Sequence, residues 1–328
     1  MVLDTGRETG RILDDLVPTA RRIGAAIESV IEGKPGAIRL TLAVLLAEGH
    51  LLIEDVPGVG KTMLAKGLAR AIDGSVRRVQ FTPDLLPSDI TGVSAYNQER
   101  RIFEFKPGPV FANIVLGDEI NRASPKTQSA LLEVMQEQTV TTDATVYRVP
   151  SPFVVVATQN PIDLEGTYVL PEAQLDRFMM RLRIGYPGPD AEARILRTEK
   201  DEPTVSHLAP VMTGEELLEL IEFVKRTVEV APAVENYIVA VCAHTRTLPE
   251  VRLGVSPRGS LALLRAARVT AASSGRTYVT PDDVKEMAPA TLCHRIILRP
   301  DAEVHGRTAE EVVARALQSV PVPRLVVR

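Results

Sequence analysis

A lysine and a threonine follow a glycine-containing turn early in the chain, in a pattern that could bind phosphate. Leu51–Glu54 is an apolar run, Gly58 and Gly60 lie in the turn, and Lys61-Thr62 opens a helical stretch. Glycines let backbone N–H groups turn toward phosphate oxygens, and the start of a helix adds positive potential. In such a loop the lysine neutralises the β- and γ-phosphates and the threonine hydroxyl binds Mg²⁺. The sequence therefore predicts a phosphate-binding loop after a strand.

One position of this loop departs from the usual pattern. The pattern G-x-x-x-x-G-K-[ST] has its first glycine where this chain has Asp55. Phosphates would repel an acidic side chain that faced them, so we expect Asp55 to point outward. The alternative is a fortuitous Gly-Lys-Thr at the start of a helix.

Two carboxylates end a second apolar run. Ile114–Leu116 leads through a glycine into Asp118 and Glu119. Phosphoryl transfer depends on positioning and on neutralising charge. We predict that Asp118 holds Mg²⁺ through water and that Glu119 orients and deprotonates the attacking water. A solvated acidic strand end is the alternative.

Three further polar residues could take part in this chemistry. The apolar run 153–157 leads to Asn160, which could hold the water or the γ-phosphate or could simply form a turn before Pro161. Pro161 also replaces the lysine of a guanine-reading Asn-Lys-x-Asp motif, which disfavours a GTPase. An arginine can stabilise transition-state charge, but spacing alone does not select Arg177 or Arg258.

The order of elements predicts how these residues are positioned. From residue 51 to about 185, short strands alternate with helices, which indicates a parallel α/β sheet. The predicted strands are Leu51–Glu54, Val76–Phe81, Ile114–Leu116, Phe153–Ala157 and Met180–Ile184. Helices over 12–31 and about 37–47 precede them, and two hairpins interrupt them near 93–106 and 138–149.

Beyond residues 187–189, a Pro-Gly-Pro segment, the chain is predicted to be helical. Helix start signals occur at four positions, where a hydroxyl residue precedes Pro or an acidic third residue. These residues are Thr213, Ser256, Thr280 and Thr308. We therefore predict two domains: an α/β nucleotide-binding core over 1–186 and a helical lid over 187–328.

Composition excludes some classes of protein. The formal net charge is −4, which argues against binding nucleic acid through overall charge. Aromatic residues make up 4% of the chain, too few for a protein that stacks single-stranded bases. Two arginine pairs, Arg77-Arg78 and Arg100-Arg101, keep a nucleic-acid motor as an alternative.

Cysteines and apolar runs bear on the compartment. Cys242 and Cys293 form neither a disulfide framework nor a zinc pattern, so we predict reduced structural thiols. The longest apolar run is far shorter than a membrane span, and no signal-peptide core follows the N-terminus. These features predict a cytoplasmic protein.

Taken together, the motifs resemble the MoxR family of AAA+ ATPases. The stretches that carry the resemblance are Gly117–Gln128, Leu131–Glu137, Phe81–Pro87, Ala157–Pro161 and Pro171–Phe178. The resemblance spans about residues 15 to 300. It implies an αβα core with a five-stranded parallel sheet in the order 5-1-4-3-2, followed by an all-α lid.

The resemblance also implies roles for individual residues, with ATP and Mg²⁺ as cofactors. Lys61, Glu119 as the base and Asn160 as sensor 1 would be catalytic. Arg177 would be an arginine finger acting on a neighbouring copy, and Arg258 would be sensor 2, in cis or in trans because a helical insert moves the lid. Thr62 and Asp118 would hold the metal. The nucleotide would be bound by Pro57, Gly58, Val59, Gly60, Lys61, Thr62 and Met63, with Ile31 and Gly33 beside the adenine.

The implied assembly is a ring, usually of six copies, with ATP between them. The implied function is chaperone-like remodelling of client protein complexes, often with a partner that has a von Willebrand A domain. The two hairpins would be inserts that contact the client. The alternatives are the motor subunit of a metal chelatase and, less favoured, a nucleic-acid motor.

Overall fold

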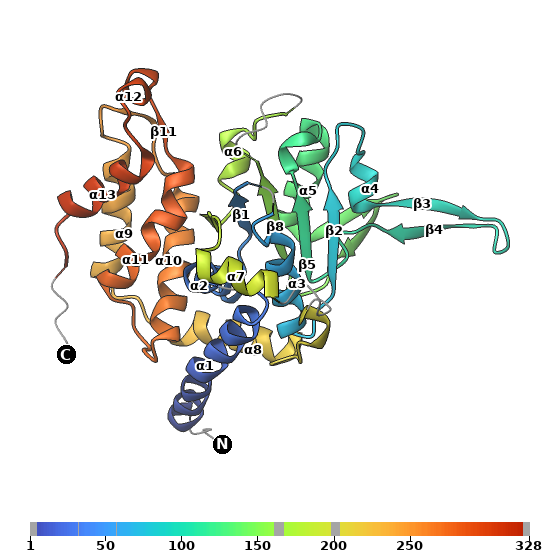
Figure 1. The fold of residues 1–328 in the computed structure, drawn as a ribbon, viewed down its shortest axis with the longest axis horizontal. Coiled ribbons are helices and arrows are strands. Elements are labelled where there is room, and N and C mark those ends of the chain that lie inside the picture. Colours follow the sequence, from blue (N-terminus) through green and yellow to red (C-terminus); the bar gives the residue numbers. More distant parts are fainter. Residues whose placement is uncertain (1–4, 32, 57, 161–166, 198–203, 324–328) are drawn as a thin grey trace.

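A five-stranded parallel sheet forms the centre of the computed structural model, which describes residues 5–31, 33–56, 58–160, 167–197 and 204–323. The strand order β2-β5-β8-β1-β9 is the predicted order 5-1-4-3-2 read from the other edge. The strands are β1 (Leu51–Glu54), β2 (Val76–Gln80), β5 (Ile114–Asp118), β8 (Val154–Gln159) and β9 (Met180–Leu182) (Figure 1).

The inner strands are apolar on both faces, as a covered parallel sheet requires. In β1, Leu51 and Ile53 join one buried cluster, whereas Leu52 joins a second cluster on the other face. Helices α1 (Thr5–Glu28), α2 (Pro35–Leu46) and α3 (Lys61–Ala71) contribute to the first cluster. The second cluster contains apolar residues of α4 (Pro87–Thr91) and α5 (Pro125–Glu137). The core is therefore a three-layered αβα unit.

Both predicted hairpins form and stay outside the central sheet. The first pairs β3 (Gly92–Asn97) with β4 (Ile102–Pro107) and extends away from the body of the molecule (Figure 1). The second pairs β6 (Thr139–Thr142) with β7 (Thr145–Arg148). The Phe105 ring stacks on the Tyr147 ring with centroids 4.1 Å apart, so the two hairpins contact each other near their bases.

After β9 the elements are mainly helical, and the predicted helix starts are confirmed. The side-chain oxygens of Thr213, Ser256, Thr280 and Thr308 each accept a hydrogen bond from a first-turn backbone N–H. Such caps are worth about 1 kcal/mol each. The helices are α7 (Pro189–Arg197), α8 (Gly214–Thr227), α9 (Pro232–Thr245), α10 (Pro257–Ser273), α11 (Pro281–Leu292), α12 (Pro300–Val304) and α13 (Ala309–Ser319).

Smaller elements complete the described chain. A short antiparallel pair, β10 (Val251–Leu253) with β11 (Ile297–Leu298), lies within the helical region and was not predicted. The remaining short pieces are α6 (Glu172–Leu175), η1 (Ile120–Arg122), η2 (Thr204–His207) and η3 (Cys293–Arg295).

Two expectations about composition can be compared with this fold. Cys242 and Cys293 are free and buried, as predicted, and burial raises the pKa of Cys293 to about 12. Among the helices that the structure describes, none is both long and apolar enough to cross a membrane.

Candidate functional site

The polar strand ends predicted to carry chemistry meet at one edge of the sheet. Gln80 pairs in register with Asp118, and Glu54 pairs with Gln159, because parallel strands end at the same edge. A cavity of about 310 Å³ opens there. Its lining consists of Gly58, Gly60, Lys61, Thr62, Met63, Arg78, Gln80, Asp118, Glu119 and Asn160.

The loop before α3 has the backbone that a phosphate site needs. Gly58 and Gly60 have φ of +85° and +92°, which favour glycine, and Gly60 caps α3. Val59 is buried, and Pro57 lies outside the described residues. The Lys61 ammonium donates to the Asp55 carbonyl at 2.5 Å. Burial lowers the pKa of Lys61, while the carboxylates around it act in the opposite direction.

The expectation that Asp55 points outward is wrong. Asp55 is 8% exposed, and its side chain turns back into the molecule. One carboxylate oxygen accepts from Val56 N at 2.8 Å. The other accepts from Ile184 N at 2.7 Å and Gly185 N at 2.6 Å. Asp55 avoids the phosphate side because these three amides satisfy its carboxylate inside the protein.

A buried threonine links the two predicted acidic residues. The Thr158 hydroxyl donates to Asp118 at 2.6 Å and accepts from Glu119 N at 3.0 Å. Glu119 itself has φ 57° and ψ 50°, a left-handed conformation that is uncommon outside glycine. Thr158 therefore holds both carboxylate residues at the strand ends. A polar residue at the end of an otherwise apolar run was the only sequence signal for it.

Strand β2 adds two contacts that sequence reasoning missed. Arg78 donates to Asp118 at 2.6 Å, and Gln80 donates to Glu119 at 3.0 Å. Arg122 forms an ion pair with Glu119 at 3.2 Å. The Arg77-Arg78 pair was the reason to keep a nucleic-acid motor as an alternative. One member of that pair, Arg78, instead lines this cavity.

The remaining predicted nucleotide contacts divide between the cavity and its surroundings. Asn160 is 7% exposed and lines the cavity, as a residue that senses a phosphate would need to do. Ile31 is buried and Gly33 is exposed, and neither lines it. Their contact with the adenine stays a prediction.

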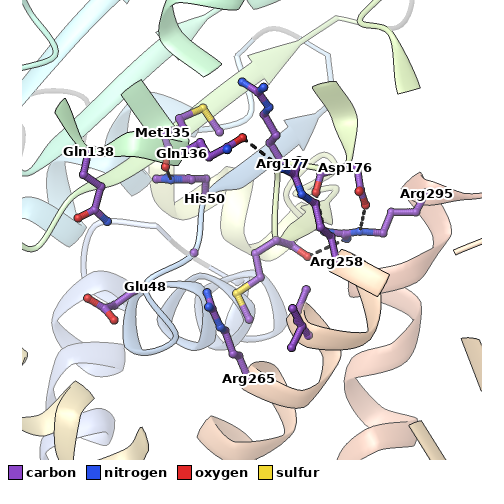
Figure 2. A pocket seen from close by; sticks show the side chains of 14 residues that line it. Glu48, His50, Met135, Gln136, Gln138, Asp176, Arg177, Arg258, Arg265 and Arg295 are labelled. Atoms are coloured by element: carbon purple, nitrogen blue, oxygen red, sulfur yellow. Dashed lines mark hydrogen bonds and ion pairs between the residues drawn. The ribbon is translucent and has the colours of Figure 1, made fainter. Parts of the chain in front are cut away.

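Arg177 and Arg258 lie in a different cavity of about 440 Å³, which shares no lining residue with the first. The two arginines come from the segment before β9 and from the first turn of α10, and the structure brings them together (Figure 2). Arg258 donates to Gln136 at 3.2 Å. The structure therefore places these two cations in a different cavity from Lys61.

Two further arginines, Arg265 and Arg295, line the second cavity and were not predicted. Arg265 is exposed, and the structure shows no ion pair or hydrogen bond for its side chain among the described residues. It follows Arg258 by two helical turns, which places both on one face of α10. Figure 2 shows Arg177, Arg258 and Arg265 around the cavity. The helical spacing between Arg258 and Arg265 was the sequence signal that could have identified Arg265.

Within the described residues, no group of three or more His, Cys, Asp or Glu side chains could hold a metal ion. Thr62 and Asp118 instead offer a hydroxyl and a carboxylate, the hard oxygen ligands that suit Mg²⁺. This donor set fits a cation that is also held by phosphates.

Comparison with known proteins decides the family. Residues 50–180 match the family described as "ATPase family associated with various cellular activities (AAA)", and residues 243–316 match an AAA lid domain. The Bacillus subtilis protein YeaC is 49% identical over 94% of this chain and 97% of its own. Chaperone MoxR1 of Mycobacterium tuberculosis is 43% identical over 94% of this chain and 84% of its own. The chain belongs to the MoxR family of AAA+ ATPases.

A solved structure supports the AAA+ fold along the whole chain. A protein from Cytophaga hutchinsonii assigned as an ATPase is 36% identical and superposes with a TM-score of 0.90. The match covers 99% of this chain and 100% of that one. Membership of this family implies nucleotide binding, and the loop cavity has the shape and charges for it.

Proposed function

We propose that this MoxR-family chain hydrolyses ATP with Mg²⁺ between neighbouring copies of itself, in a ring of six. The observation that carries the proposal is that the predicted catalytic residues lie in two separate cavities. Lys61 and Glu119 line one cavity, whereas Arg177 and Arg258 line another. A γ-phosphate in transfer needs cations around it. A second copy would supply them, so the complete site would lie at an interface.

The residues of the loop cavity support specific roles. Lys61 would bind the β- and γ-phosphates, and Asn160 would hold the γ-phosphate or the attacking water. Glu119 would orient and deprotonate that water, and the Thr158 contact to its backbone would keep it in place. Thr62 and Asp118 would hold Mg²⁺, which would neutralise phosphate charge when bound.

The division into a core over 1–186 and a lid over 187–328 belongs to the same proposal. It is supported by the end of β9 at Leu182 and the start of α7 at Pro189, where strands give way to helices. Arg258 would then sit on the lid, and Arg177 on the core. The arginine pair would respond to the angle between the two parts.

The hairpins are the proposed contact with client proteins. Phe103 is 70% exposed and its ring lies against Tyr96, with centroids 5.3 Å apart. Val146 at the second hairpin is 61% exposed. Apolar side chains on a projecting element suit loosely folded protein segments. The name of the Mycobacterium relative, a chaperone, supports remodelling of clients. A von Willebrand A partner and a cytoplasmic location stay predictions.

ATP turnover by a Glu119→Gln variant tests the proposal. The amide cannot accept the water's proton, so turnover should fall by about 100-fold or more. Binding of a fluorescent ATP analogue should stay within about 3-fold, because the phosphate contacts remain. Glu235→Gln, an exposed acid on α9, is the matched control and should keep full turnover. Unchanged hydrolysis in Glu119→Gln would contradict the assignment.

The Glu119→Gln variant can also be used to identify the client proteins. With ATP bound, Glu119→Gln should retain client proteins during affinity purification. Adding Phe103→Ser should release them while nucleotide binding stays unchanged. Equal capture with and without Phe103 would rule out this hairpin as the contact. A metal-insertion assay with candidate partner proteins separates general remodelling from the chelatase alternative.

A further inference from the structure

Asp55 occupies the place of a loop glycine, yet two of the three groups that bind its carboxylate lie far along the chain. Its three partners are the N–H groups of Val56, Ile184 and Gly185, all at 2.6 to 2.8 Å. A carboxylate that accepts several backbone N–H groups is held firmly in one orientation. Asp55 is thus a fixed connection between the phosphate-binding loop and residues 184–185.

Residues 184–185 form the connection between the sheet and the helical region. They follow β9, which ends at Leu182, and precede α7, which begins at Pro189. Gly185 has φ +68°, so the chain turns sharply there. Lys34 donates to the Tyr186 carbonyl at 2.7 Å and holds the next residue from the side of α2. The turn that leads into α7 is therefore held by the Asp55 carboxylate on one side and by Lys34 on the other.

The main chain of Asp55 instead bonds to Lys61, which lines the loop cavity, and to the residue before Asn160. Its carbonyl accepts from the Lys61 ammonium at 2.5 Å. Its N–H donates to the Gln159 carbonyl at 3.2 Å, beside Asn160. One residue thus contacts the phosphate-binding lysine and the strand end that carries Asn160 through its main chain. Through its side chain it contacts the turn before α7.

We propose that Asp55 is a positioning residue that transmits triphosphate binding at Lys61 to the turn at Ile184 and Gly185. Phosphate oxygens compete with the Asp55 carbonyl for the Lys61 ammonium. The displacement of Asp55 moves the turn at Ile184 and Gly185, which leads into α7. The inference rests on the proposed function and adds to it the route from the nucleotide to the helical region.

Two substitutions separate this role from a structural one. Asp55→Gly restores the usual loop residue and removes the carboxylate. Asp55→Asn keeps the size but loses the charge and one acceptor oxygen. Both should bind a fluorescent ATP analogue within about 3-fold of the wild type, because the loop amides and Lys61 remain. Turnover should fall by about 10-fold, within the usual range of coupling between sites. Asp73→Gly, at an exposed residue with φ 48°, is the matched control and should change neither.

Hydrogen exchange of the peptide that covers residues 180–190 reads the turn directly. In the wild type, a non-hydrolysable ATP analogue should change exchange of the Ile184 and Gly185 amides by about 3-fold or more. In both Asp55 variants that change should disappear. Asp55→Asn carries the test if Asp55→Gly melts at a lower temperature than the assay allows.

The outcomes are distinguishable. A wild type that hydrolyses ATP, with both variants equal to it in turnover and in nucleotide-dependent exchange, overturns this inference alone. Variants that lose nucleotide binding by more than about 10-fold also overturn it, because Asp55 would then act in binding rather than in transmission. A wild type that binds no nucleotide overturns the proposed function and this inference together.

Discussion

Arg295 and Asp176 form a salt bridge of 2.8 Å that joins the helical region to the segment carrying Arg177. Arg295 is 7% exposed and also donates to the carbonyls of Phe178 and Met179, at 2.7 and 3.1 Å. Asp176 accepts a further bond of 2.8 Å from Ser256, the residue that caps α10. Asp176 therefore holds the segment before β9 against the start of α10, where Arg258 lies.

Arg295→Met should destabilise the protein by about 3–5 kcal/mol, the usual loss when one partner of a buried pair is removed. The substitution removes the donor that Arg295 now provides to the Asp176 carboxylate and to the carbonyls of Phe178 and Met179. Urea unfolding measures the loss. Arg226→Met, which breaks an exposed pair with Glu222, should cost less than about 1 kcal/mol. Similar losses of unfolding free energy in both variants would contradict the stabilising role of the buried Arg295 ion pair.

Arg265→Ala should lower ATP turnover by about 10-fold, since a cation near a transferring phosphate contributes to transition-state stability. Arg265→Lys should keep most of the activity, because charge rather than a fixed hydrogen bond is required. Steady-state turnover at saturating ATP measures the effect, with Arg226→Ala as the surface control. Full activity of Arg265→Ala would show that this arginine does not act on the transferring phosphate.

Acid should weaken the fold through His50. Burial lowers the pKa of His50 to about 4, although its contact with the Met135 carbonyl acts in the opposite direction. Its Nδ1 accepts from Val155 N at 3.1 Å, so the ring must remain neutral there. The unfolded chain binds this proton near pH 6.5, so stability is complete above that pH and is lost as pH falls toward 4.

The expected loss from His50 is about 3 kcal/mol between pH 6.5 and 4. Burial also lowers the pKa of His294, which adds to the loss in the same direction. Urea unfolding at a series of pH values measures it. His50→Gln should be less stable at pH 7 but should lose less stability on acidification. An equal pH dependence in both proteins would show that His50 does not titrate on unfolding.

Much of the fold could be predicted because its signals are local. Apolar runs, and alternating β-branched residues in the case of Val76–Phe81, predicted the five central strands within about two residues, and the strand order came from the family resemblance. Hydroxyl caps such as Thr213 and Ser256 bond to N–H groups within three residues, so the neighbouring sequence is enough to predict where these helices begin.

The parts that could not be predicted depend on contacts between distant segments. Asp55 binds amides 129 and 130 residues away, and spacing near the loop cannot reveal them. Arg78 reaches Asp118 only because β2 and β5 are neighbours in register. The shared cavity of Arg177 and Arg258 likewise follows from the packing of the helical region against the core.

The central claim is that an active site combines Lys61 of one copy with Arg177 of another. Lys61→Ala and Arg177→Ala should each abolish turnover when expressed alone. Co-expressed in equal amounts, they should recover about a quarter of wild-type turnover, the fraction of interfaces in a randomly filled ring that pair two intact halves. Assemblies shown by mass to contain both variants, yet as inactive as either alone, would contradict the claim.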